Sequence, residues 1–239
     1  MERFFLAALC RAPGVGSRVA ASLVRILGTA QDVWQARVEA LRAAHLSPER
    51  AAELYDFCRR NEALPEEIAA ACEKGGISLF VPSDEAYPAL LKEIYNPPQT
   101  LFCRGSLNCL KRPAVAMVGA RRASAYGKGA AEDIALGLAE SGFVVVSGAA
   151  RGIDTASHKG ALKAGATVAV LGCGVDVAYP RENVRLLAEI AEKGAVISEY
   201  APGTAPLAAF FPARNRIISG VAHGTIVVEA AERSGSLIT

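Results

Sequence analysis

The hydrophobic positions follow different patterns in the two parts of the chain. Residues 1–75 are rich in Ala, Leu, Arg and Glu and lack strand-like alternation, which predicts helices. From residue 76 onward, short continuous apolar runs alternate with segments of helical character. Such apolar strands separated by helices are typical of a parallel sheet that is covered on both faces. We therefore expect a small all-helical domain at residues 1–75 and an α/β domain at residues 76–239.

The apolar runs of the second part have the lengths of strands. They cover residues 77–81, 100–105, 114–119, 143–148, 167–172, 195–199 and 224–229. Helices are expected between them at residues 126–141, 154–164, 183–193 and 213–220. This order predicts a Rossmann-like fold with a doubly wound, mostly parallel sheet. Because the last residues, SGSLIT, have the position of a starting helix, we also expect the protein to continue beyond them.

A short glycine-containing turn lies inside the N-terminal part. Pro13, Gly14, Val15 and Gly16 separate two segments with helical apolar periodicity. This layout is typical of a helix-hairpin-helix (SAM-like) unit, in which glycines allow a tight turn to present backbone N–H groups to a phosphate. An ordinary helix–turn–helix packing unit is the alternative, so DNA contact at this turn stays open.

Composition and charge narrow the classes of function. Lys and Arg total 26 against 24 Asp and Glu, so a polyanion would have to be bound by a local basic patch. The six cysteines form no CxxC pair and the three histidines lie far apart, which argues against a metal site and favours reduced thiols in a cytoplasmic protein. No apolar run approaches the roughly 20 residues that span a bilayer. We expect a protein that does not enter a membrane.

The loops after the expected strands contain the chemically distinctive residues. In an open parallel sheet, ligands bind beyond the carboxyl ends of the strands. Residues 95–130 contain six basic side chains and no acidic one, and the only Lys, Arg, Asp or Glu residues at 201–227 are Arg214 and Arg216. Glycines, helix N-termini and arginines together suit phosphate groups. The sequence therefore predicts a phosphate-binding edge, provided that these loops converge.

Structural roles are the alternative for several of these residues. Arg121 or Arg151 could hold strand ends together by pairing with a carboxylate of Asp154, Asp176 or Glu229. Asn215 could cap or brace its own helix. An adjacent pair, Phe210 and Phe211, could lie in the core, although one member of such a pair at a helix start tends to face outward. An exposed phenylalanine beside Arg214 would stack on a base or on a neighbouring chain.

Motifs for catalysis or nucleotide cofactors are missing. The sequence has no GxSxG elbow and no Walker A motif, and GARRAS stands where a GxGxxG would follow the first core strand. Ser157 and His158 are neighbours on a helix and point apart, so we expect His158 to be a hydrogen-bonding residue on the helix surface. No enzyme activity, cofactor or metal is expected.

Several ordered motifs resemble one known family. VGARRASAYG, VVSGAARGIDTASHKGAL, TVAVLGCGVDVAYPREN, FPARNRIISG and VVEAAERSGSLIT are similar to those of the DNA-processing protein A (DprA/Smf) family. The resemblance implies a single-stranded DNA-binding protein of natural transformation, or competence, and DNA recombination. It also implies a homodimer that loads a RecA-type recombinase onto DNA without hydrolysing nucleotides.

The resemblance also assigns DNA-binding residues. The family's phosphate-binding arginine corresponds to Arg121, and Phe211 corresponds to a base-stacking phenylalanine. The complete expected set is Gly119, Arg121, Arg122, Arg151, Gly152, Phe211, Arg214, Asn215 and Arg216. Two positions depart from the family pattern, because Ala120 replaces a hydroxyl residue and Ala208 replaces a basic one. Both departures predict weaker or rearranged binding of the strand.

Two other functions compete with this interpretation. Rossmann-like folds that resemble the cytokinin-activating phosphoribohydrolases hold a nucleoside monophosphate at the same sheet edge and use a glutamate there. Glu229 could take that role, although VAHGTIVVEAAERSGS matches the PGGxGT motif of those enzymes only in part. The third possibility is an architectural protein whose sheet edge contacts another protein.

Overall fold

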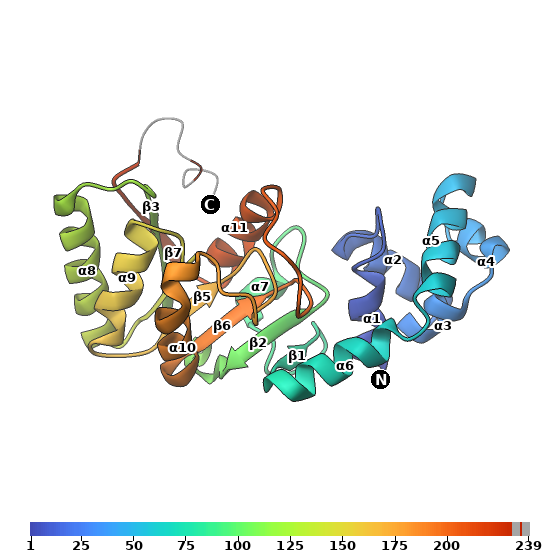
Figure 1. Ribbon diagram of the computed structural model, residues 1–239, viewed down its shortest axis with the longest axis horizontal. Helices are drawn as coiled ribbons and strands as arrows, with labels where there is room; N and C mark the ends of the chain where they lie inside the picture. The colour runs from blue at the N-terminus through green and yellow to red at the C-terminus, as the bar shows by residue number, and fades with distance from the viewer. Residues whose placement is uncertain (231–234, 236–239) are drawn as a thin grey trace.

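A computed structural model describes residues 1–230 and 235 of the protein. Helices alone form the N-terminal part, drawn in blue and cyan in Figure 1. They are α1 Glu2–Leu9, α2 Ser17–Leu27, α3 Ala30–Gln35, α4 Val38–Ala43, α5 Pro48–Arg60 and α6 Leu64–Gly75. Thr29 and Ser47 cap α3 and α5 through their hydroxyl groups, as their positions before the helices favour. The helix expected at SGSLIT lies outside the described residues apart from Gly235.

A seven-stranded sheet forms the centre of the remaining chain. Its strands are β1 Ser78–Phe80, β2 Leu101–Gly105, β3 Ala114–Gly119, β4 Val144–Ser147, β5 Thr167–Val170, β6 Ala195–Ser198 and β7 Gly224–Val228. Their order is β1-β2-β6-β5-β4-β3-β7. The five strands from β6 to β7 are parallel, whereas β2 pairs antiparallel with both β1 and β6. The mostly parallel sheet is therefore confirmed.

Helices cover both faces of this sheet (Figure 1). The α-helices of this part are α7 Ala89–Lys92, α8 Ala125–Glu140, α9 Ile153–Leu162, α10 Val184–Lys193 and α11 Phe210–Gly220. On β3, Met117 packs with α8 and α9, whereas Ala116 and Val118 pack with α7 and α11 on the opposite face. Successive side chains of a strand point to opposite faces, which is why each apolar run is continuous. The fold is doubly wound, as expected.

The strand order creates a switch point between β3 and β7. The chain runs from β3 through β4 and β5 to β6 on one side, and then returns to place β7 on the other side of β3. Loops at such a switch point diverge and leave a crevice at the carboxyl ends of the strands. The loops that follow β3, β4 and β5 start at this edge.

His158 is buried instead of lying on a helix surface. It is 0% exposed, because α9 packs on the sheet and has α8 and α10 as its neighbours. Its Nδ1 lies 2.8 Å from the hydroxyl of Thr167 on β5. The expectation of a surface residue was wrong, because helix periodicity does not reveal that α9 is enclosed by neighbouring helices as well as by the sheet. Among the described residues, none of the helices has the length and apolar character that a membrane span requires.

Candidate nucleic-acid interface

A cavity of about 480 Å³ lies at the carboxyl ends of β3, β4 and β5. Its walls come from the loops after these strands and from the start of α11. Four arginines and one glutamate are among its lining residues: Arg121, Gly148, Ala150, Arg151, Tyr179, Pro180, Arg181, Glu182, Pro206, Phe211 and Arg214. The excess of positive charge favours an anionic ligand.

Close packing at two glycines holds the first two loops together. A Cβ atom on Gly152, whose φ is +78°, would lie 2.2 Å from the Ala120 carbonyl oxygen, and one on Gly119 would lie 1.9 Å from the Val228 carbonyl oxygen. The first amide of α9, that of Ile153, donates to Ala120 at 3.2 Å. These glycines were expected to bring the backbone to a phosphate, but neither lines the cavity. They position the Arg121 loop beside the Arg151 loop.

Arg214 is buried beneath the cavity. Its side chain occupies the space that a Cβ on Gly148 would need, and it donates to the carbonyl oxygens of Gly148 and Val170. Only 4% of the residue is exposed. Burial raises the pKa of the neighbouring Asp154 carboxyl, while the positive charge of Arg214 opposes that shift. Arg214 therefore links the ends of β4 and β5 from below, which leaves it little surface for a strand of DNA.

Arg151 reaches across the cavity to a carboxylate. Its Nε donates to Glu182 Oε1 at 2.5 Å and its Nη2 donates to Oε2 at 2.7 Å. The two side chains stay 66% and 51% exposed. Glu182 raises the pKa of the Arg151 guanidinium, and its own pKa is lowered in return. The structure thus gives Arg151 a carboxylate partner, but this partner is Glu182 and not Asp154, Asp176 or Glu229. The pair is exposed and lies at the cavity.

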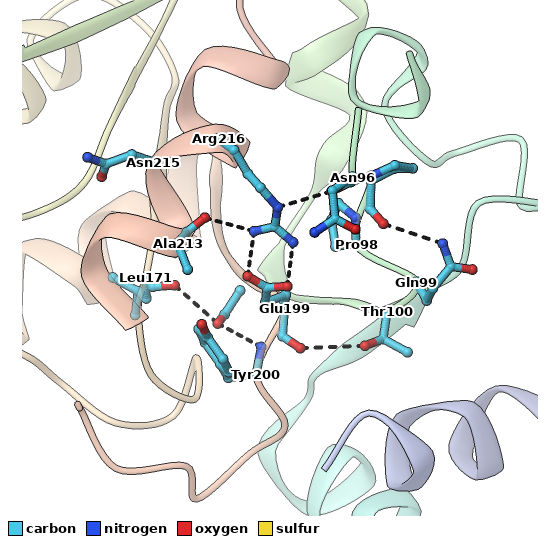
Figure 2. A network of polar contacts seen from close by, with 12 residues as sticks. Asn96, Pro98, Gln99, Thr100, Leu171, Glu199, Tyr200, Ala213, Asn215 and Arg216 are labelled. Atoms are coloured by element: carbon cyan, nitrogen blue, oxygen red, sulfur yellow. Dashed lines mark hydrogen bonds and ion pairs between the residues drawn. The ribbon is translucent and has the colours of Figure 1, made fainter. Parts of the chain in front are cut away.

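Arg216 is held in a separate network (Figure 2). It donates to both oxygens of Glu199 at 2.6 Å, and its Nε donates to the carbonyl of Asn96 at 3.0 Å. The pair is 24% and 14% exposed. Asn215 points away from this network and donates to the Gly235 carbonyl at 3.3 Å. The expected convergence of all arginines on one edge was therefore wrong for Arg216, whose charge is neutralised inside the protein, and Asn215 does not line the cavity either.

Two phenylalanines at the start of α11 have different partners. Phe210 stacks on Tyr200 with a centroid distance of 4.1 Å and lies outside the cavity lining. Phe211 faces the cavity, where its ring lies 5.2 Å from that of Tyr179. The guanidinium carbon of Arg121 lies 5.8 Å from the Phe211 centroid. The cavity thus brings together an exposed arginine and an aromatic ring from distant parts of the sequence.

The loop after β5 supplies residues that the sequence interpretation missed. Tyr179, Arg181 and Glu182 all line the cavity. They lie in TVAVLGCGVDVAYPREN, which enters the sequence interpretation only as a family motif. The rule that ligands bind after the carboxyl ends of strands would have included them if it had been applied to the whole loop. Arg122 is exposed beside Arg121 and does not line the cavity.

Glu229 closes the N-terminus of α8. Its carboxylate accepts from the backbone N–H of Ser124 at 2.8 Å and from the Ser124 hydroxyl at 2.6 Å. These hydrogen bonds lower the pKa of the carboxyl group. A Cβ on Gly127 would lie 1.9 Å from Glu229 Oε2, so this glycine makes room for the contact. The carboxylate occupies a helix end that would otherwise favour a phosphate.

Comparison with known proteins agrees with the motifs of this site. A family model described as DNA recombination-mediator protein A matches residues 78–239, from β1 onward. The chain belongs to this family. Among family relatives, DNA processing protein DprA of Streptococcus pneumoniae is 52% identical over 157 residues, which cover 65% of this chain and 55% of that protein. Protein Smf of Synechocystis is 35% identical over an alignment of 243 positions, which covers 100% of this chain and 61% of that protein.

Solved structures of family members extend the similarity to the fold. The X-ray structure of DprA from Streptococcus pneumoniae has a TM-score of 0.83 at 37% identity and covers 100% of this chain and 81% of that chain. DNA processing protein A from Helicobacter pylori has a TM-score of 0.63 at 33% identity, over 68% of this chain and 73% of that chain. The Helicobacter structure was described for its single-stranded DNA binding mode. The chain spans 55–61% of the length of three curated relatives that it matches.

Proposed function

We propose that this protein binds single-stranded DNA in the arginine-lined cavity. The observation that carries the proposal is the position of Arg121 beside the Phe211 ring, 5.8 Å from its centroid, inside one cavity. Single-stranded DNA is bound by such combinations, because cationic groups follow the phosphates while aromatic rings stack on the bases. The Helicobacter pylori relative, described for this kind of binding, supports the proposal.

The exposed arginines make the direct contacts in this proposal. Arg121 and Arg181 are exposed at the cavity, and Arg151 becomes available when a phosphate replaces Glu182. Buried Arg214 supplies positive charge from below and fixes the loop above it. Because base stacking and phosphate contacts tolerate any sequence, the affinity should depend strongly on salt and weakly on base identity.

We infer that the protein acts by binding and not by catalysis. The phosphoribohydrolase interpretation needs Glu229 as a catalytic group, but its carboxylate accepts two hydrogen bonds from Ser124, the N-cap residue of α8. Incubation with nucleoside monophosphates should therefore release no base. Membership in a family described as DNA recombination-mediator protein A supports a role in recombination during natural transformation. We extend the proposal on that basis to a homodimer that loads a RecA-type recombinase.

Fluorescence anisotropy with a labelled oligothymidine tests the proposal. Arg121→Glu should weaken binding by roughly 10- to 100-fold, because it replaces a phosphate contact by repulsion. Arg50→Glu makes the same charge change on the exposed surface of α5, outside the cavity, and should bind like the parent protein. Equal affinities of the two variants would place the binding site elsewhere.

A further inference from the structure

The two tyrosine–phenylalanine pairs at the start of α11 differ in how much aromatic surface they leave free for a ligand. Phe210 and Tyr200 are stacked, with their rings inclined by 20° at a centroid distance of 4.1 Å. Phe211 and Tyr179 are inclined by 38° at 5.2 Å, and both line the cavity. Tyr179 is 44% exposed. The first pair is a closed packing contact, whereas the second presents aromatic surface to a ligand.

The loop that carries Tyr179 is fixed to the rest of the site. Pro180 is buried directly after it, and the buried side chain of Asn183 donates to the Ala149 carbonyl at 3.0 Å and to the Thr155 hydroxyl at 2.8 Å. These bonds attach the loop after β5 to the loop after β4. An aromatic ring on such a support loses little conformational freedom when a ligand binds, so stacking on it is favourable.

We propose that Tyr179 is a second base-stacking residue, on which a nucleobase stacks in continuation of the Phe211 ring. Arg181, two positions further along the same loop, and Arg121, beside Phe211, lie in the same cavity wall and can hold the phosphates of that strand. The proposal rests on the proposed binding of single-stranded DNA. It adds a particular contact: an unpaired base of any identity on the Tyr179 ring.

In a purely structural role, Tyr179 would pack against Phe211 without contacting a base. Tyr179→Trp separates the two roles, because the chain's one natural tryptophan, Trp34, is 3% exposed among the N-terminal helices and gives a constant background. At saturation, oligothymidine should quench the fluorescence of the new tryptophan, and an abasic oligonucleotide of equal length should not. Identical signals with the two oligonucleotides would overturn the proposal.

Affinities give an independent readout. Tyr179→Phe should bind oligothymidine within about twofold of the parent, whereas Tyr179→Leu should bind roughly 5- to 100-fold more weakly, the range that one base–aromatic stack contributes. Tyr179→Leu should not weaken binding of the abasic strand. Tyr95→Leu is the matched control, because Tyr95 is 85% exposed, contacts Arg18 and lies outside the cavity lining.

The same assays distinguish failure of this inference from failure of the proposed function. If Tyr179→Leu binds oligothymidine like the parent while Arg121→Glu binds more weakly, Tyr179 is no stacking residue and the DNA site stands. If Arg121→Glu also binds like the parent, the cavity is not the DNA site and both proposals fall.

Discussion

Arg151 and Glu182 face each other through two hydrogen bonds, from Nε to Oε1 at 2.5 Å and from Nη2 to Oε2 at 2.7 Å. The guanidinium therefore presents its fork to a carboxylate in the geometry that a phosphate would use. Both side chains are more than half exposed, and exposed ion pairs contribute little to stability. In the proposed complex with DNA, a phosphate would therefore take the place of Glu182 at this guanidinium.

Glu182→Gln should strengthen binding of oligothymidine several-fold, because Arg151 no longer has an anionic partner to lose. The slope of log affinity against log salt should change by much less than the roughly 0.7 of one added phosphate contact, because Arg151 binds the same phosphate in both proteins. Anisotropy titrations over a salt series measure both quantities.

A double-mutant cycle identifies Arg151 as the cause of that change. In an Arg151→Gln background, the Glu182→Gln substitution should leave the affinity for oligothymidine nearly unchanged. A general effect of removing negative charge near the cavity would instead persist in this background and would contradict the competition between Glu182 and phosphate.

Gly152→Ala should lower the free energy of unfolding by about 1–3 kcal/mol, because the residue has a positive φ and its Cβ would lie 2.2 Å from a backbone oxygen. Gly129→Ala, in α8 with open space around its Cβ position, is the matched control and should be neutral or stabilising by up to about 1 kcal/mol. Urea denaturation measures both. A neutral Gly152→Ala would mean that the two loops are not packed as described.

Arg216→Met should lower the free energy of unfolding by about 2–3 kcal/mol, because it leaves the largely buried Glu199 carboxylate without its partner. Measured at a temperature where the variant is folded, its affinity for oligothymidine should equal that of the parent. This outcome separates Arg216 from Arg121, whose replacement should change affinity with little effect on stability. Loss of affinity at unchanged stability would return Arg216 to the DNA site.

The sequence predicted the centre of the sheet well because β4, β5 and β6 are buried on both faces and are therefore continuous apolar runs. It could not predict that β2 lies antiparallel beside β6, since that pairing joins segments about 90 residues apart in the chain. No local sequence pattern distinguishes an antiparallel strand such as β2 from the parallel strands beside it. The order of strands depends on which faces pack best once the whole sheet has formed.

The sequence predicted the site only where its residues directly follow a strand or match a family motif. Arg121 follows a predicted strand and Phe211 comes from the family resemblance, and the two residues do meet in the cavity. Arg214 and Arg216 were grouped together, yet two positions on a helix differ by about 200° in direction, so one lies under the cavity and the other contacts Glu199. Which direction faces the cavity depends on how α11 docks on the sheet, and this information lies in long-range packing.

His158 makes the stability of the fold depend on pH. The hydroxyl of Thr167 donates to the Val145 carbonyl at 2.6 Å, so its oxygen accepts the proton that His158 carries on Nδ1. The other ring nitrogen, Nε2, is buried without a hydrogen-bond partner among the described residues. A second proton would have to be placed there, inside the protein. Burial, together with the positive charge of Arg214, lowers the pKa of His158 from 6.5 to about 3.

Because this pKa is lower in the folded state, the unfolded chain binds more protons between pH 3 and pH 6.5. The stabilising contribution of neutral His158 is complete above pH 6.5 and is lost as the pH falls, with a slope approaching about 1.4 kcal/mol per pH unit. The titration of His158 alone should therefore lower the free energy of unfolding, measured by urea denaturation, by about 2 kcal/mol between neutral pH and pH 5. His158→Gln, which keeps a polar side chain but does not titrate, should be less stable at pH 7 and should show a smaller loss on acidification. Parallel pH profiles for the variant and the parent would mean that His158 already takes up its proton in the folded protein.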